Sequence, residues 1–117
     1  MSEENVIQLD LGTTAQKTTA AEKLPVVLLA LDQGKYDMPR SLDELRALAD
    51  ANGMQAVAEV VQKRQTPEAA TLLGEGKVAE ARLVCQNVRA AAAIFDGELT
   101  GSQIRNLSAA LQVEVLD

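Results

Sequence analysis

The sequence predicts a small α/β domain, a three-layer sandwich with helices on both faces of a mostly parallel sheet of about four strands. Two observations lead to this fold class. Short apolar runs alternate with segments of helical periodicity between residues 23 and 117. The first run, LPVVLLAL, is apolar throughout, which is typical of a parallel strand buried on both faces. Hydrophobic residues make up 47% of the 117 residues, which is enough for one core.

The first elements follow from composition and from the apolar runs. Thr, Glu, Gln and Ala dominate residues 1–22, so we expect a flexible N-terminal arm, with at most a short edge strand over residues 6–11. The α/β domain is expected over residues 23–117. Residues 24–31 predict a central strand that ends at Asp32.

The first helix is expected after a polar loop over residues 33–40. Ser41 and Glu44 have the spacing of a capping box, which predicts that the helix begins at Ser41. Gly53 is expected to end it. Residues 54–61 (MQAVAEVV) then predict a second strand.

The second half of the chain repeats this alternation. A helix is expected over residues 77–88, and a strand over residues 90–95, although the alanines of AAAAIF favour a helix on propensity alone. Thr100 and Gln103 form a second capping-box pattern, which predicts the start of the last helix. Residues 113–116 complete the sheet as a short strand.

Composition excludes several functions. The net charge of −6 argues against a general nucleic-acid binder, although a local basic patch remains compatible with it. The only aromatic residues are Tyr36 and Phe95, too few for a platform that stacks bases. Histidine is absent, so Cys85 lacks the usual base for nucleophilic catalysis and is expected to be a buried small residue. A lone cysteine and the lack of a long apolar run predict a cytoplasmic protein that does not span a membrane.

The stretch over residues 62–77 (QKRQTPEAATLLGEGK) carries the main candidate site. Gly74 and Gly76 are expected to permit tight or left-handed geometry where a strand passes into a helix. The amino end of that helix, with Lys77, could hold an anion or an RNA backbone. The stronger expectation for the same residues is a strand-to-helix turn and nothing more.

Further cations and acids lie near the predicted strand ends. Lys63 and Arg64 follow the second strand and could contact phosphate oxygens or simply face solvent. Arg105 lies beside the apolar stripe of the last helix and could contact RNA or a partner domain, or simply face solvent. Asp32 and Asp96 end strands that could be neighbours, as in a phospho-acceptor receiver domain. Capping or loop roles are the stronger expectation for both, because the acid cluster of such a site is missing.

Two nucleotide-binding patterns fail on inspection. The P-loop pattern G-x-x-x-x-G-K-[ST] would need glycine at Thr71 and a hydroxyl residue at Val78. Residues 10–14 (DLGTT) look like the phosphate turn of sugar kinases, but a chain of 117 residues is too short for the two lobes of that fold. We expect no metal, no cofactor and no catalytic residue in this chain, which is therefore not expected to be an enzyme alone.

Residues 24–117 resemble the N-terminal domain of the HflX family of ribosome-associated GTPases. Three blocks carry the resemblance, and their order and spacing are more specific than any one of them. The blocks are Gln62-Lys63-Arg64 with Pro67, Ala70-Thr71 and Gly74-x-Gly76-Lys77-Val78; Phe95-Asp96-x-Glu98-Leu99 with Ser102-Gln103-x-Arg105-Asn106-Leu107; and Leu111-x-Val113-x-Val115-Leu116-Asp117.

The resemblance implies a non-catalytic domain that helps bind the large ribosomal subunit and its RNA, and that regulates the GTPase domain of the same protein. GTP and Mg²⁺ would belong to that GTPase domain, which this chain does not contain. The RNA contacts expected by position are Lys63, Arg64, Lys77 and Arg105. We also expect the chain to be one domain of a longer protein. The alternative is a stand-alone protein-interaction module that could form a homodimer, without nucleotide chemistry.

Overall fold

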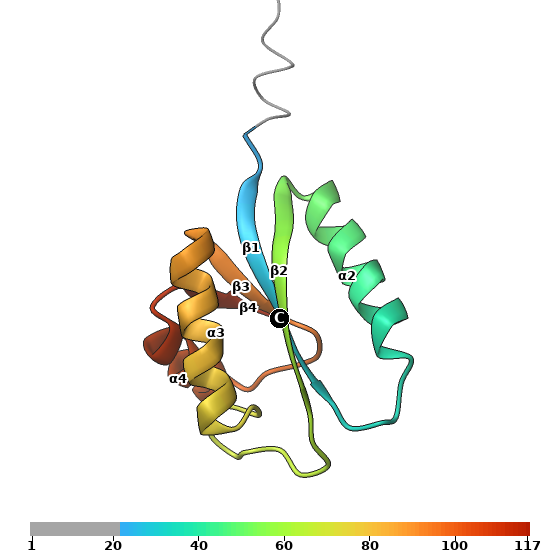
Figure 1. Ribbon diagram of the computed structural model, residues 1–117, viewed down its shortest axis with the longest axis vertical. Coiled ribbons are helices and arrows are strands. Elements are labelled where there is room, and N and C mark those ends of the chain that lie inside the picture. The colour runs from blue at the N-terminus through green and yellow to red at the C-terminus, as the bar shows by residue number, and fades with distance from the viewer. Residues whose placement is uncertain (1–21) are drawn as a thin grey trace, which may run out of the picture.

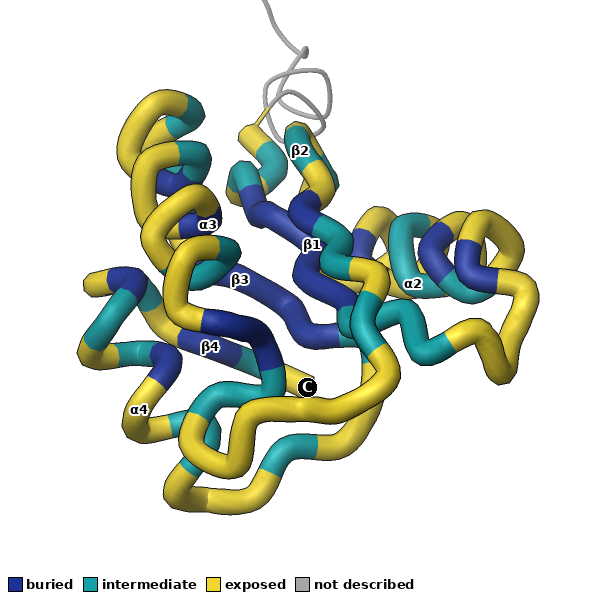
Figure 2. Tube along the Cα trace, turned by 60° about the horizontal axis from the view of Figure 1, so that its bottom comes forward, coloured by how far each residue is buried: buried dark blue, intermediate teal, exposed yellow. Residues whose placement is uncertain are grey.

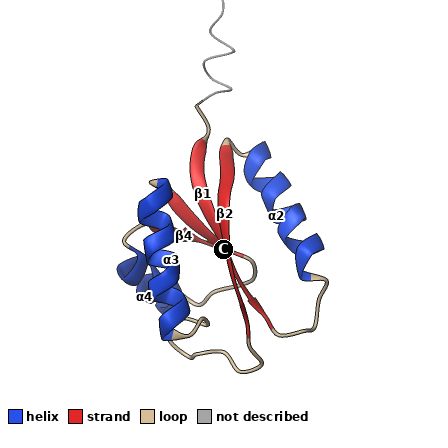
Figure 3. Cartoon of the chain, in the orientation of Figure 1, coloured by secondary structure: helices blue, strands red, loops and turns tan. Residues whose placement is uncertain are grey.

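The computed structural model describes residues 22–117, so the expected arm and the strand over residues 6–11 lie outside the described residues. Strands and helices alternate along the whole described chain (Figures 1 and 3). The elements are β1 (Leu24–Asp32), α2 (Met38–Ala51), β2 (Met54–Lys63), α3 (Glu75–Val88), β3 (Ala92–Phe95), α4 (Gly101–Leu111) and β4 (Glu114–Leu116). Among these residues no helix is both long and apolar enough to cross a membrane.

The sheet confirms the predicted fold class. Its four strands have the order β2-β1-β3-β4, and every neighbouring pair is parallel. Helix α2 covers one face, and α3 and α4 lie together on the other face (Figure 1). The domain is therefore a three-layer sandwich, in which each strand delivers its carboxyl end to the same edge of the sheet.

Strand β1 is the centre of the core. Val26 to Ala30 are all fully buried, because β1 has a strand on each side and a helix layer on each face (Figure 2). Alternate side chains enter two separate clusters, as the twofold period of a strand requires. Val27 and Leu29 pack beneath α3 and α4, whereas Val26, Leu28 and Ala30 pack beneath α2.

The alanine-rich run forms a strand, as predicted, but a shorter one. Strand β3 begins at Ala92, because α3 ends in the left-handed residue Arg89 and the amide of Ala91 bonds to the carbonyl oxygen of Pro25. All four residues of β3 are buried between β1 and β4. Tertiary burial thus overrides the helix propensity of alanine.

The predicted start of the first helix is wrong. Helix α2 begins at Met38, and Asp37 is its N-cap, with Oδ1 accepting a bond from the amide of Arg40 at 3.2 Å. Pro39 fits because the first turn needs no donor at that position. Ser41 therefore lies inside the helix, and its Oγ donates to Oδ2 of Asp96 at 2.7 Å.

The other helix starts agree more closely. Thr100 and Gln103 form the predicted capping box of α4: Thr100 Oγ1 accepts from the Gln103 amide, and Gln103 Oε1 accepts from the Thr100 amide. Helix α3 begins at Glu75, two residues before the expected Lys77, and Gly74 is its N-cap without a side-chain bond.

Candidate functional site

The candidate site is the β2–α3 loop, residues 64–74, at the carboxyl edge of the sheet. The β1–α2 loop, residues 33–37, emerges beside it because β1 and β2 are paired up to Asp32 and Lys63. Both loops lie at the end of the domain opposite residue 22 (Figure 1). Parallel sheets collect their ligands beyond this edge.

Side-chain amides hold the β2–α3 loop in one shape. Gln62 Oε1 accepts a bond from the amide of Gly74 at 2.7 Å, which ties the end of the loop to the end of β2. From α4, Gln103 Nε2 donates to the carbonyl oxygen of Ala69 at 3.2 Å, and Asn106 Nδ2 donates to that of Ala70 at 3.0 Å. Loop backbone groups that water would otherwise satisfy are therefore bonded within the domain.

The loop also carries an anchor and a strained residue. Leu73 is fully buried beneath α3 and α4. Its neighbour Leu72 has a φ of 63°, which a bulky residue adopts only when the surrounding structure requires it. Leu72 and Glu68 exchange two backbone hydrogen bonds, of 2.9 and 3.1 Å, across the loop. The anchor and this bridge supply the constraint that holds Leu72 in place.

Two glutamines join the two loops of the carboxyl edge. Gln33 Nε2 donates to the carbonyl oxygen of Gln65 at 2.8 Å, and Gln65 Nε2 donates to that of Gln33 at 3.1 Å. The loops border an open hollow of about 370 Å³, whose lining includes Asp32, Gly34 and Lys63. The edge is therefore a shaped, hydrogen-bonded surface with a cation on its rim.

Arg64 is committed to the loop itself. Its Nη2 atom forms an ion pair with Glu68 Oε2 at 2.8 Å, and its guanidinium lies against Gly74, where a Cβ atom would meet Nη1. The amide of Gly74 is likewise occupied by Gln62. The positive charge of Arg64 is thus partly neutralised before any ligand arrives.

The remaining predicted cations lie in different surroundings. Lys63 is exposed at the end of β2 and has no acidic partner among residues 22–117. Lys77 pairs with Glu80 at 3.0 Å within α3. Arg105 is exposed on α4, where Nη2 contacts Ser102 Oγ at 3.3 Å. Lys63 and Arg105 are consequently the predicted cations that no described carboxylate neutralises.

Neither glycine of the candidate turn adopts the left-handed geometry that was one of the two expected for it. Positive φ among the described glycines occurs at Gly34, Gly53 and Gly97, whereas Gly74 has a φ of −68°. The position of Gly74 requires a residue without a side chain, because Arg64 and Gln62 approach it closely. Gly76 lies inside α3, and nothing within 4 Å would meet its Cβ atom.

The acids and the cysteine fill structural positions. Asp32 Oδ1 accepts from the amide of Gly34 at 2.9 Å, and Asp96 holds Ser41, in line with the expected loop and capping roles. Within residues 22–117 no group of three or more His, Cys, Asp or Glu side chains is arranged to hold a metal ion. Cys85 is buried, and burial raises the pKa of its thiol.

The amides that brace the loop were missed as a group by sequence reasoning. Gln62 and the pair Gln103 and Asn106 belong to two blocks that are far apart in the chain, and the structure brings them to the same loop. Both blocks belong to the resemblance to one family. Their joint occurrence was the signal that could have indicated a contact between them.

Similarity to known proteins identifies the family of this chain. A family model described as GTP-binding GTPase N-terminal matches residues 39–117. The chain is 38% identical over 93 residues to GTPase HflX of Lacrimispora saccharolytica, covering 79% of this chain and 22% of that protein. It is 34% identical over 98 residues to GTPase HflX of Caldanaerobacter subterraneus, covering 84% and 23%. GTPase HflX of Escherichia coli K12 is 30% identical over 98 residues, with coverage of 84% and 22%.

The position of the match agrees with the fold. It includes the β2–α3 loop and both sequence blocks that brace it. The chain spans less than a quarter of the length of these relatives. The chain therefore belongs to the GTP-binding GTPase N-terminal family and corresponds to the N-terminal domain of HflX-type GTPases.

Proposed function

We propose that this domain contacts the large ribosomal subunit and regulates the GTPase domain of the same polypeptide, in the cytoplasm and without chemistry of its own. GTP and Mg²⁺ are assigned to the GTPase domain. Family membership supports the link to a GTPase domain, because the relatives are GTPases.

The observation that carries the proposal is the braced β2–α3 loop. A loop whose backbone is bonded to Gln62, Gln103 and Asn106 is ordered before it meets a partner, so binding costs less conformational entropy. The charge available for RNA is local, with Lys63 on the rim of the hollow and Arg105 on α4. Such a surface suits a contact that positions the domain on folded RNA through a few phosphates.

Co-sedimentation with purified large ribosomal subunits tests this role, using the chain alone and joined to an HflX GTPase domain. The variant Lys63→Gln/Arg105→Gln should lower the fraction of the domain that sediments with the subunit. It should also reduce the slope of log affinity against log salt concentration by the amount expected for the loss of about one or two phosphate contacts. Arg40→Gln is the matched control, because Arg40 is an exposed cation on α2 that pairs with Glu44. Equal binding of the double variant and the control would refute the assignment.

A further inference from the structure

Strand β2 leaves one side of its backbone without a strand partner among residues 22–117. It pairs with β1 alone and is the longest strand, with ten residues from Met54 to Lys63. The opposite edge strand, β4, has only three residues. An open edge of this length presents a row of backbone donors and acceptors to which another strand can be added.

A groove runs between this edge and α2, and we call it the β2–α2 groove. One hollow of about 370 Å³ has an apolar floor that includes Met38, Leu42 and Val61. A second hollow, of about 470 Å³, lies between Asp50 on α2 and Gln55 on β2. Asp43 lines both hollows, so they adjoin.

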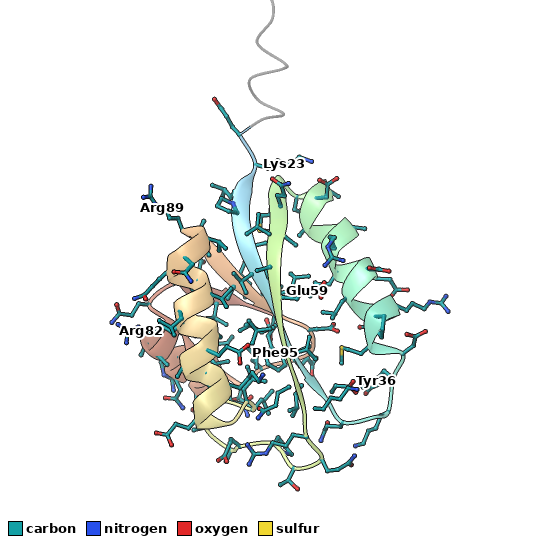
Figure 4. The ribbon with its side chains drawn as sticks, in the orientation of Figure 1. Lys23, Tyr36, Glu59, Arg82, Arg89 and Phe95 are labelled. Carbon is teal, nitrogen blue, oxygen red and sulfur yellow. The ribbon has the colours of Figure 1, made fainter. Side chains whose placement is uncertain are left out.

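The groove exists because a charged residue occupies a strand position that faces α2. Glu59 lies next to Leu28 of β1, whose side chain packs in the cluster beneath α2. Glu59 pairs instead with Arg46 of α2, and Figure 4 shows it between the strand and the helix. Arg46 also pairs with Asp43 at 3.0 Å, so one guanidinium serves two carboxylates.

The charge of the groove favours a basic occupant. Its two linings contain four carboxylates and two cations: Asp32, Asp43, Asp50 and Glu59 against Arg46 and Lys63. Lys23 contacts Asp50 at one end, which leaves three carboxylates against two cations, an excess of one negative charge, over the rest of the groove. A cation placed there is attracted to the carboxylates, and the partly apolar surroundings strengthen this attraction while adding a cost of desolvation.

We infer that the β2–α2 groove binds an extended segment of another protein. Along this segment basic residues alternate with other residues, and one apolar side chain lies near the basic ones. The segment would add a strand to β2. Side chains of a strand that face one way recur every second residue. An apolar side chain over Leu42 and Val61 therefore places a basic one beside Glu59, two residues away.

Charge also disfavours the other occupants. Pairing the β2 edges of two copies in the register centred on Glu59 would bring this carboxylate opposite its own equivalent, and like charges across paired strands are destabilising. Residues 1–21 carry three acids and one lysine, so they too match the groove poorly in charge. The inference does not depend on the ribosome contact proposed above, because it rests on the open edge of β2 and the facing side of α2, although the two surfaces share Asp32 and Lys63.

The probe is a capped peptide of alternating lysine and valine, titrated into the 117-residue chain and followed by backbone amide NMR and hydrogen exchange. We expect shifts and new protection confined to β2 and α2. A glutamate–valine peptide should not bind, and lysine–valine peptides methylated at the alternate backbone nitrogens that face β2 should lose binding. Asp43→Asn/Glu59→Gln should weaken binding about threefold to tenfold.

Glu44→Gln is the matched control, because Glu44 lies on α2 but outside both groove linings. Urea unfolding of each variant separates lost binding from lost folding. The inference would be overturned if the glutamate–valine peptide bound as tightly as the lysine–valine peptide. It would also be overturned if methylation left binding unchanged at both sets of alternate backbone nitrogens. Finding β2 edge amides already protected in the free chain would overturn it as well, because a second copy or residues 1–21 would then occupy the edge.

Discussion

Replacing Gly74 with alanine should destabilise the domain, whereas the same change at Gly76 should stabilise it. A Cβ atom at Gly74 would meet Nη1 of Arg64 and would lie 3.1 Å from Nε2 of Gln62. The guanidinium must then move away from Glu68, to which it is bonded at 2.8 Å. At Gly76 the added methyl group meets nothing within 4 Å.

The magnitudes follow from these surroundings. Gly74 is the N-cap of α3, where alanine is poorer than glycine by about 1 kcal/mol, and a partly exposed ion pair such as Arg64–Glu68 adds up to about 1 kcal/mol. Gly74→Ala should therefore lower the free energy of unfolding by about 1–2 kcal/mol. Gly76→Ala should raise it by about 0.5 kcal/mol, because alanine restricts the unfolded chain and the site lies in the first turn of the helix.

Urea unfolding followed by far-ultraviolet circular dichroism measures both changes, since the chain lacks tryptophan. The midpoint should shift while the slope m stays constant. When Arg64 has already been replaced by alanine, Gly74→Ala should lower the free energy of unfolding only by the contribution of the N-cap. A Gly74→Ala domain as stable as the unsubstituted chain would refute the close packing of Arg64 on Gly74.

Three further changes test the loop and the core. Asn106→Ala removes the bond to the carbonyl oxygen of Ala70, so it should cost about 1 kcal/mol and speed hydrogen exchange within residues 64–74. Leu73→Ala should cost about 2–5 kcal/mol in thermal or urea unfolding, because Leu73 is fully buried. Burial raises the pKa of the Cys85 thiol, so the unfolded chain loses that proton first. Stability should fall as pH rises past the ordinary thiol pKa, and Cys85→Ala should abolish that dependence.

The order of the elements was predictable because each depends on local periodicity. The apolar runs became β1, β2, β3 and β4, and the segments with helical spacing became α2, α3 and α4. Boundaries were less predictable, since several residues offer competing caps. Asp37 and Ser41 are both good N-cap residues; α2 uses Asp37, and the hydroxyl of Ser41 bonds instead to Asp96 in the loop after β3.

The candidate site was located from the sequence, but its internal structure was not. The stretch over residues 62–77 does lie at the carboxyl edge, as parallel strands require. Its glycines and cations were expected either to bind an anion or to form no more than a strand-to-helix turn with a solvent-exposed loop. In the fold, Gly74 makes room for Arg64, whose charge is balanced by Glu68, and these contacts follow from side-chain packing that no local pattern encodes.

The fold class, the family and the sheet edge at which the candidate site lies could all be inferred from the chain. Hydrophobic periodicity and helix caps act over a few residues, so they are visible in the chain. The tertiary structure alone decided which polar groups meet. Gln103 and Ala69 are 34 residues apart, and Arg46 and Glu59 lie on different elements. Such contacts arise only when strand order and helix placement bring distant residues together, and they decide which charges remain available to a partner.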